Sequence, residues 1–141
     1  MDHSSNSVRA GLAASLMLGL TACAATGGPQ AALPPGEWGG QGVALTVTAD
    51  GAGIAYDCAA GTISAALRPD AAGRFRAGGT HTPNLGGPER LDDPRPSHSA
   101  LYAGQVRGSV MTLSVAIPAT GAEMGPFRLR RGAPPTLHRC L

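Results

Sequence analysis

The chain has 141 residues, a length that suits one small domain and excludes a kinase or a multidomain enzyme. Hydrophobic residues make up 43% of the chain, which is enough for a packed core, whereas aromatic residues make up only 4%. The formal net charge of +2 is too small to indicate nucleic-acid binding, so we expect no nucleic-acid partner.

The first 22 residues have the three-part pattern of an export signal. Residues 1–9 are polar with Arg9 as the only strong cation, residues 10–20 form an uncharged apolar run, and two small residues follow. The apolar run is too short for a transmembrane helix, which needs about 20 residues. A short buried helix is the alternative interpretation, but its many Ala and Gly residues make a poor core helix.

The run Leu20, Thr21, Ala22, Cys23 resembles the lipobox of bacterial lipoproteins. The resemblance implies that the chain is cut before Cys23 and that the Cys23 thiol carries a diacylglycerol, since a thiolate is the nucleophile that accepts the lipid. Two or three acyl chains anchor a protein firmly to a membrane. We therefore expect a protein of the bacterial cell envelope, lipid-anchored to a membrane, with its domain on the periplasmic or extracellular face.

The cysteine count is consistent with this interpretation. Three cysteines leave one without a partner in an exported protein, but lipidation of Cys23 leaves an even pair, Cys58 and Cys140. An oxidising compartment favours a disulfide between these two residues. Two unpaired buried thiols are the alternative, and a metal site is disfavoured because neither cysteine has a second ligand at zinc spacing.

Two regions are expected after the signal peptide of residues 1–22. Residues 23–36 comprise the lipidated cysteine and a disordered tether, because residues 24–35 have no apolar period and are rich in Ala, Gly and Pro. Residues 37–141 form the folded domain.

Within the domain the apolar residues recur with a period of two, which is typical of half-buried strands. We expect strands at residues 43–47, 54–58, 63–67, around 75, 102–106, 111–117 and 127–129, and a short closing strand at 137–141. We expect turns at residues 50–53, 59–61, 69–73, 108–109 and 120–122.

Seven or eight short strands joined by tight turns predict an all-β fold. Consecutive hairpins favour a small up-and-down antiparallel β-barrel, because closure removes the exposed sheet edges; a β-sandwich is the alternative. An eight-stranded barrel is either filled by its side chains or wide enough for one small ligand, and the sequence leaves both open.

The segment 78–97 interrupts the regular spacing and is expected to be a long loop. His81 and His98 flank Asp92 and Asp93, a set that would suit a divalent metal. The histidines lack metal-ligand spacing, so solvated loop residues are the favoured interpretation. Because the chain also lacks a Gly-x-Ser-x-Gly motif, we expect no catalytic residue, no metal and no cofactor.

The remaining candidates are aromatic and basic residues that suit binding. Trp38 is expected to plug one end of the barrel, or alternatively to form the floor of a ligand pocket. The candidate binding residues are Trp38, Tyr56, Tyr102, His81 and His98. A basic patch for anionic lipid headgroups or wall polymers is expected if the strands that carry its arginines are neighbours; ordinary solvent-facing arginines are the alternative. These arginines are Arg74, Arg76, Arg128, Arg130 and Arg131.

Two families share motifs with this domain. The runs at residues 38–51, 54–61 and 139–141 resemble a group of small exported bacterial proteins of unknown function, which implies a fold and a location but no activity. A second similarity is to lipoprotein inhibitors of C-type lysozyme, which are small β-barrels with a Tyr-x-Cys motif bridged to a late cysteine. Tyr56-Asp57-Cys58 and Cys140 fit that pattern, and residues 99–102 are similar to the inhibitory serine loop.

The sequence therefore indicates a non-enzymatic binding module for a small apolar ligand or an envelope protein. The alternative, implied by the second resemblance, is a protein that blocks an enzyme through its loops. A metal-dependent enzyme that uses the segment 78–97 is the third hypothesis.

Overall fold

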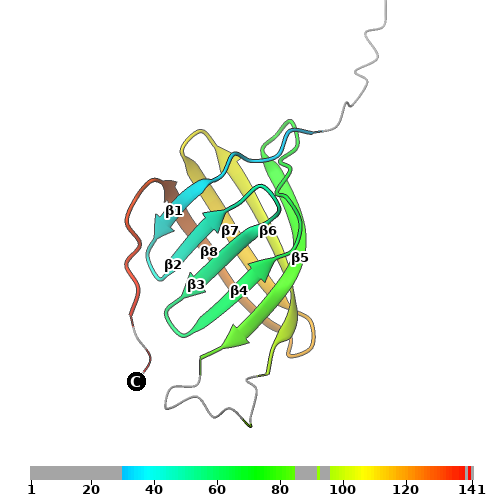
Figure 1. The fold of residues 1–141 in the computed structure, drawn as a ribbon, viewed down its shortest axis with the longest axis vertical. Helices are drawn as coiled ribbons and strands as arrows, with labels where there is room; N and C mark the ends of the chain where they lie inside the picture. Colours follow the sequence, from blue (N-terminus) through cyan, green and yellow to red (C-terminus); the bar gives the residue numbers. More distant parts are fainter. Residues whose placement is uncertain (1–29, 85–91, 93–95, 139, 141) are drawn as a thin grey trace, which may run out of the picture.

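The computed structural model describes residues 30–84, 92, 96–138 and 140. Eight antiparallel strands close into a barrel in which each strand pairs with its neighbours in the sequence and β1 pairs with β8 (Figure 1). The strands are β1 (Gly36–Gly40), β2 (Val43–Val47), β3 (Ala52–Tyr56), β4 (Ala59–Ile63), β5 (Arg74–Pro83), β6 (His98–Arg107), β7 (Val110–Ile117) and β8 (Ala122–Arg131). The predicted up-and-down antiparallel barrel is confirmed, and the sandwich alternative is wrong.

Alternation along the strands fills the barrel with apolar side chains. In β7, Met111, Leu113 and Val115 are buried, whereas Thr112 and Ser114 between them are exposed. Every other strand also contributes at least one buried hydrophobic side chain to the same core. The core therefore occupies the barrel interior, as a period of two in the sequence requires.

The β3–β4 hairpin turns earlier than predicted. The turn lies at Asp57 and Cys58, so β4 occupies residues 59–63 rather than 63–67. Gly61, expected in a turn, instead lies inside β4, where the Tyr102 hydroxyl takes the space that a Cβ atom would need. Glycine at this position of the strand allows a neighbouring side chain to approach closely. Because glycine is also common in turns, the sequence pattern wrongly predicts a turn here.

The expected long loop over residues 78–97 is also wrong for its first part. Residues 78–83 continue β5, which pairs with β6 from Arg74 opposite Gln105 to His81 opposite His98. At Gly79 a Cβ atom would overlap the Thr62 carbonyl oxygen of β4. The glycines that indicated a loop thus permit the strands to approach closely.

The start of β1 defines one end of the barrel, which we call the entry end. The turns at residues 48–51 and 108–109 and the β4–β5 connection also lie there, and residues 30–35 run across it (Figure 1). Leu33 is buried in the core, and its backbone N–H donates to the Leu67 carbonyl oxygen over 2.7 Å. The expected tether over residues 23–36 is therefore wrong for residues 30–36, which belong to the folded domain.

After β8 the chain forms a strap, described at residues 132–138 and 140, that leads to the opposite end of the barrel. The Thr136 N–H donates to the Gly40 carbonyl over 3.0 Å, and the Thr136 carbonyl accepts from the Gly42 N–H over 2.8 Å. Over its described residues the expected closing strand at 137–141 is wrong. Among the described residues of the strap, one isolated bridge forms, from Gln41 to Thr136, and Pro134 and Pro135 just before it lack the N–H groups that a continuous ladder needs.

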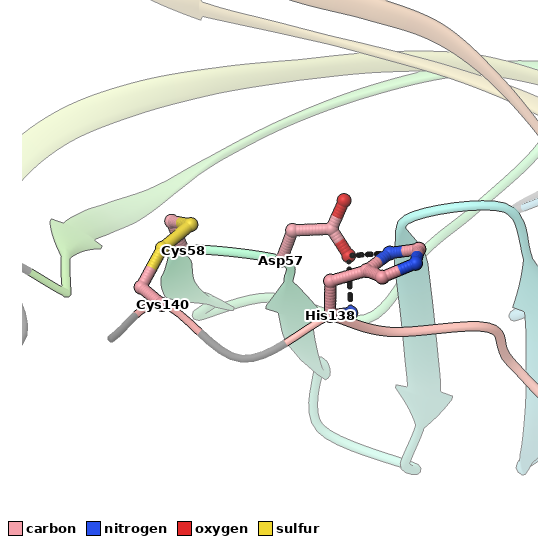
Figure 2. Close-up of polar contacts among 4 residues, drawn as sticks. All are labelled: Asp57, Cys58, His138 and Cys140. Carbon is pink, nitrogen blue, oxygen red and sulfur yellow. Dashed lines mark hydrogen bonds and ion pairs between the residues drawn. A yellow bond between two sulfur atoms is a disulfide. The ribbon is translucent and has the colours of Figure 1, made fainter.

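A disulfide and one polar contact hold the end of the strap. Cys140 is bonded to Cys58 in the β3–β4 turn, with the two Cα atoms 5.4 Å apart (Figure 2). Beside the disulfide, the His138 backbone N–H donates to Asp57 Oδ1 over 2.8 Å, and His138 Nδ1 lies 3.6 Å from the same oxygen. The predicted Cys58–Cys140 pairing is thus confirmed.

Candidate functional site

Four of the five candidate binding residues gather inside the barrel toward the end opposite the entry end. The Tyr56 and His81 ring centroids lie 5.7 Å apart. His98 stands directly opposite His81 across the β5–β6 pair, which puts both side chains on the same face of the sheet. The Tyr102 hydroxyl donates to the Thr80 carbonyl oxygen over 2.6 Å. The structure therefore groups residues that are up to 46 positions apart in the sequence (102 − 56).

Three members of this interior cluster are closed to solvent, whereas the fourth, His98, is half-buried. The exposed fractions of Tyr56, His81 and Tyr102 are 8%, 5% and 1%. Burial raises the pKa of Tyr56, and the nearby Tyr102 hydroxyl raises it further. Burial also lowers the pKa of His81, and His98 adds to this shift. The neutral forms of both side chains are therefore favoured, and the cluster has the character of a core.

Two polar atoms of the cluster lack hydrogen-bond partners. Neither the Tyr56 hydroxyl nor His81 Nδ1 has a partner of acceptable geometry among the described residues. The Tyr102 hydroxyl, which lies near Tyr56, donates instead to the Thr80 carbonyl. Burial of unpaired polar atoms costs free energy, so removing the Tyr56 hydroxyl should cost little stability.

The structure separates the residues of the metal site that the sequence analysis considered and disfavoured. His81 points into the barrel, whereas Asp92 is exposed, and Asp93 lies outside the described residues. Among the residues that the structure describes, no group of three or more His, Cys, Asp or Glu side chains lies close enough to hold a metal ion.

Trp38 lies apart from the interior cluster. Its side chain is 2% exposed, and the Arg131 guanidinium lies over its ring at 6.0 Å from the centroid. Arg131 is the last residue of β8, so Trp38 packs on the entry side of the core. Neither Trp38 nor Tyr56 lines any of the three surface cavities found in the described part of the chain. The geometry agrees with a packing role for Trp38.

A groove of about 540 Å³ lies on the outer wall of the barrel, across strands β5 to β8. Two rows of residues in cross-strand register form its floor. The first row is Gly78, Leu101, Ala116 and Glu123, and the second is Arg76, Ala103 and Ser114. Ala77, Tyr102 and Val115, which alternate with these rows along their strands, and residues 124–126 of β8 complete the lining. Of the candidate binding residues, Tyr102 therefore borders the groove.

The groove is hollow because small side chains stand between larger ones. No heavy atom lies within 4 Å of the place where a Cβ atom of Gly78 would stand. Leu101, its neighbour on β6, is 57% exposed, and it is the most exposed large hydrophobic residue in the described part of the chain. The groove is therefore mainly apolar, with one cation, Arg76, and one carboxylate, Glu123, in its lining.

A second, polar cavity of about 700 Å³ adjoins the groove on the side of the entry end. The two cavities share Arg76, Ala103 and Ser114. The polar cavity adds a row in register, Arg74, Gln105 and Thr112, which Arg128 extends on β8. The strands β5 and β8, which carry the arginines of the expected basic patch, are therefore not neighbours, but their arginines border one polar face.

Two further sequence predictions concern the signal peptide and the segment 99–102. Leu20, Thr21, Ala22 and Cys23, with the signal peptide, lie outside the described residues. Residues 99–102, which are similar to an inhibitory loop, lie within β6 and not in a loop. In the described ranges, no helix is long and apolar enough to cross a membrane.

No protein-family model, no curated protein and no solved structure matches this chain. The groove is not among the sites that the sequence predicts, although Leu101 gives a signal for it. It is a large apolar residue that alternates with Ala100 and Tyr102, so one of the two sets had to face solvent.

Proposed function

We propose that this protein is a lipid-anchored component of the bacterial cell envelope whose barrel is a non-enzymatic binding module for a small, mainly apolar ligand. The groove across β5 to β8 is the observation that carries this proposal. Its volume of about 540 Å³ lies in the range of small-molecule sites, about 300–1,000 Å³.

The lining of the groove agrees with a ligand that is apolar along most of its length. Leu101, Ala103 and Ala116 supply apolar contact, while Arg76 and Glu123 supply charges that would orient a polar end. A groove on the outer wall also suits a filled barrel, because the buried core leaves the interior to protein side chains. We therefore assign binding to the outer wall.

The cysteine arrangement supports the envelope location. The bond between Cys58 and Cys140 leaves Cys23 as the remaining cysteine, in a run that resembles a lipobox. Disulfides persist in oxidising compartments, which agrees with an exported domain.

Filling the groove tests the binding proposal. Gly78→Leu adds a side chain in the groove where no heavy atom obstructs its Cβ, so we expect the barrel to fold and the bound ligand to be lost. The matched control is Gly53→Leu, since Gly53 also faces open space, but in β3, away from the groove. The measurement is the native mass of each protein after gentle extraction from its membrane.

The expected result is a reproducible small adduct on the unchanged protein and on Gly53→Leu, and its absence on Gly78→Leu. An adduct that persists on Gly78→Leu would place binding elsewhere. A protein that carries no adduct would contradict the small-ligand proposal itself.

A further inference from the structure

The charges of the barrel are divided between its two halves. Every arginine in the part of the chain that the structure describes lies in the half nearest the entry end. Arg74 and Arg76 begin β5, Arg107 ends β6, and Arg68 precedes β5 in the β4–β5 connection. The other three arginines, Arg128, Arg130 and Arg131, lie in the last four residues of β8. All these side chains are exposed.

The carboxylates do not neutralise this half. It holds Glu37, Asp50 and Asp70 among the described residues, and none of them forms an ion pair with a described arginine. Asp70 Oδ1 instead accepts from the backbone N–H groups of Ala72 and Arg74, each over 2.9 Å. The opposite half holds Asp57, Asp92 and Glu123 and no described arginine. The described barrel is thus electrically polarised along its axis, with the entry end positive.

The N-terminal chain leaves the barrel at this positive end. Arg68 Nη1 donates to the Gln30 carbonyl oxygen over 2.8 Å, and Arg131 Nη2 donates to the Pro35 carbonyl oxygen over 3.5 Å. Arginines therefore contact both ends of the segment that crosses the entry end. Cys23 precedes Gln30 by seven residues (30 − 23), which span at most about 25 Å when fully extended.

We propose that the entry end docks on anionic phospholipid headgroups of the membrane that holds the anchor. This inference rests on the lipid anchor of the proposed function, because that anchor holds Gln30, which Arg68 contacts, within about 25 Å of Cys23 at the membrane surface. An anionic membrane surface attracts basic residues held close to it, and a lipid chain together with a basic surface is a common pair of membrane-binding signals. The groove, which lies farther along the outer wall, stays open to a ligand in this orientation.

The experiment uses the full acylated protein, purified from its membrane and reconstituted into vesicles. One set of vesicles contains phosphatidylcholine alone. In the second set, phosphatidylglycerol replaces a portion of the phosphatidylcholine. A fluorophore is attached through Ser109→Cys at the entry end or through Ala119→Cys at the opposite end, both exposed turn positions. The measurement is quenching by a lipid that carries the quencher on its headgroup.

We expect strong quenching at position 109 in vesicles that contain phosphatidylglycerol, weak quenching there in phosphatidylcholine, and weak quenching at position 119 in both. The double variant Arg74→Gln, Arg130→Gln should lower the ratio of docked to undocked protein roughly 25-fold, at about fivefold for each charge. The control, Ala60→Glu with Ser99→Glu, changes the net charge equally in the opposite half and should leave docking unchanged.

The docking inference would be overturned if quenching at position 109 were the same with and without phosphatidylglycerol. It would also be overturned if the control variant lost as much quenching as the arginine double variant. A further outcome would also overturn the docking inference. If a soluble polyanion protected the label at position 109 from quenching, this protection required the arginines, and phosphatidylglycerol had no effect, the arginines would bind soluble polymers. The denatured mass, taken before reconstitution, separates the two proposals. A protein without acyl chains on Cys23 contradicts the anchor and docking together, whereas an acylated protein that fails to dock contradicts docking alone.

Discussion

Individual side chains in the barrel differ in how well their polar atoms are satisfied. Tyr56 and Tyr102 are both buried and belong to the same interior cluster, but only the Tyr102 hydroxyl has a partner of good geometry, the Thr80 carbonyl. Burial of both residues follows from the period of two in the sequence. Whether each hydroxyl finds a partner depends on residues of β4 and β5. The sequence predicts a turn and a loop in place of these strands, so it does not predict the partners.

The two tyrosines should therefore respond in opposite ways to loss of the hydroxyl. Tyr56→Phe removes an unpaired buried hydroxyl, so we expect the free energy of unfolding to stay within about 0.5 kcal/mol or to rise by up to about 1 kcal/mol. Tyr102→Phe removes a hydrogen bond and leaves a carbonyl without it, so we expect a loss of about 1–2 kcal/mol. Urea unfolding of both variants measures the difference. A larger loss for Tyr56→Phe than for Tyr102→Phe would contradict this assignment of partners.

Among the structural elements, the hairpins with clean alternation were the most predictable. The strands β2 and β7 lie where the sequence placed them, because Val, Leu and Ile alternate there with small or polar residues. The glycines of β4 and β5 concealed those strands, since close approach of neighbouring strands and turn formation both favour glycine. The strap was recognisable only through Cys140, because its prolines give no periodic signal.

The disulfide should contribute much of the stability of this small barrel. The bond joins residues 82 positions apart, a separation for which the chain-entropy model gives about 4.5 kcal/mol as an upper estimate. The double variant Cys58→Ser, Cys140→Ser should therefore unfold at a markedly lower urea concentration than the unchanged protein. Asp57→Asn, which leaves the disulfide in place, is the control and should cost less than about 1 kcal/mol. Equal stability of the double variant and the unchanged protein would show that strap contacts other than the disulfide hold the C-terminus.

At the scale of the whole molecule, both proposals depend on arrangements that no local pattern reveals. The groove arises from residues on four strands, and Leu101 meets Gly78 and Ala116 only through the register of the sheet. The division of charge between the two halves likewise appears only when the ends of β5, β6 and β8 are brought together at the entry end. Composition predicted a nearly neutral chain, and the fold turns this small net charge into a polarised surface.

We propose that the barrel is an acylated envelope protein that carries a small ligand, and its mass tests both parts together. The protein is purified gently from its native membrane, and its mass is determined first in the native state and then after denaturation without reductant. We expect a denatured mass equal to residues 23–141 with acyl chains on Cys23 and two hydrogens fewer for the Cys58–Cys140 bond, and a native mass larger by one small adduct. An uncleaved chain without acyl groups, and with no adduct in the native state, would contradict it.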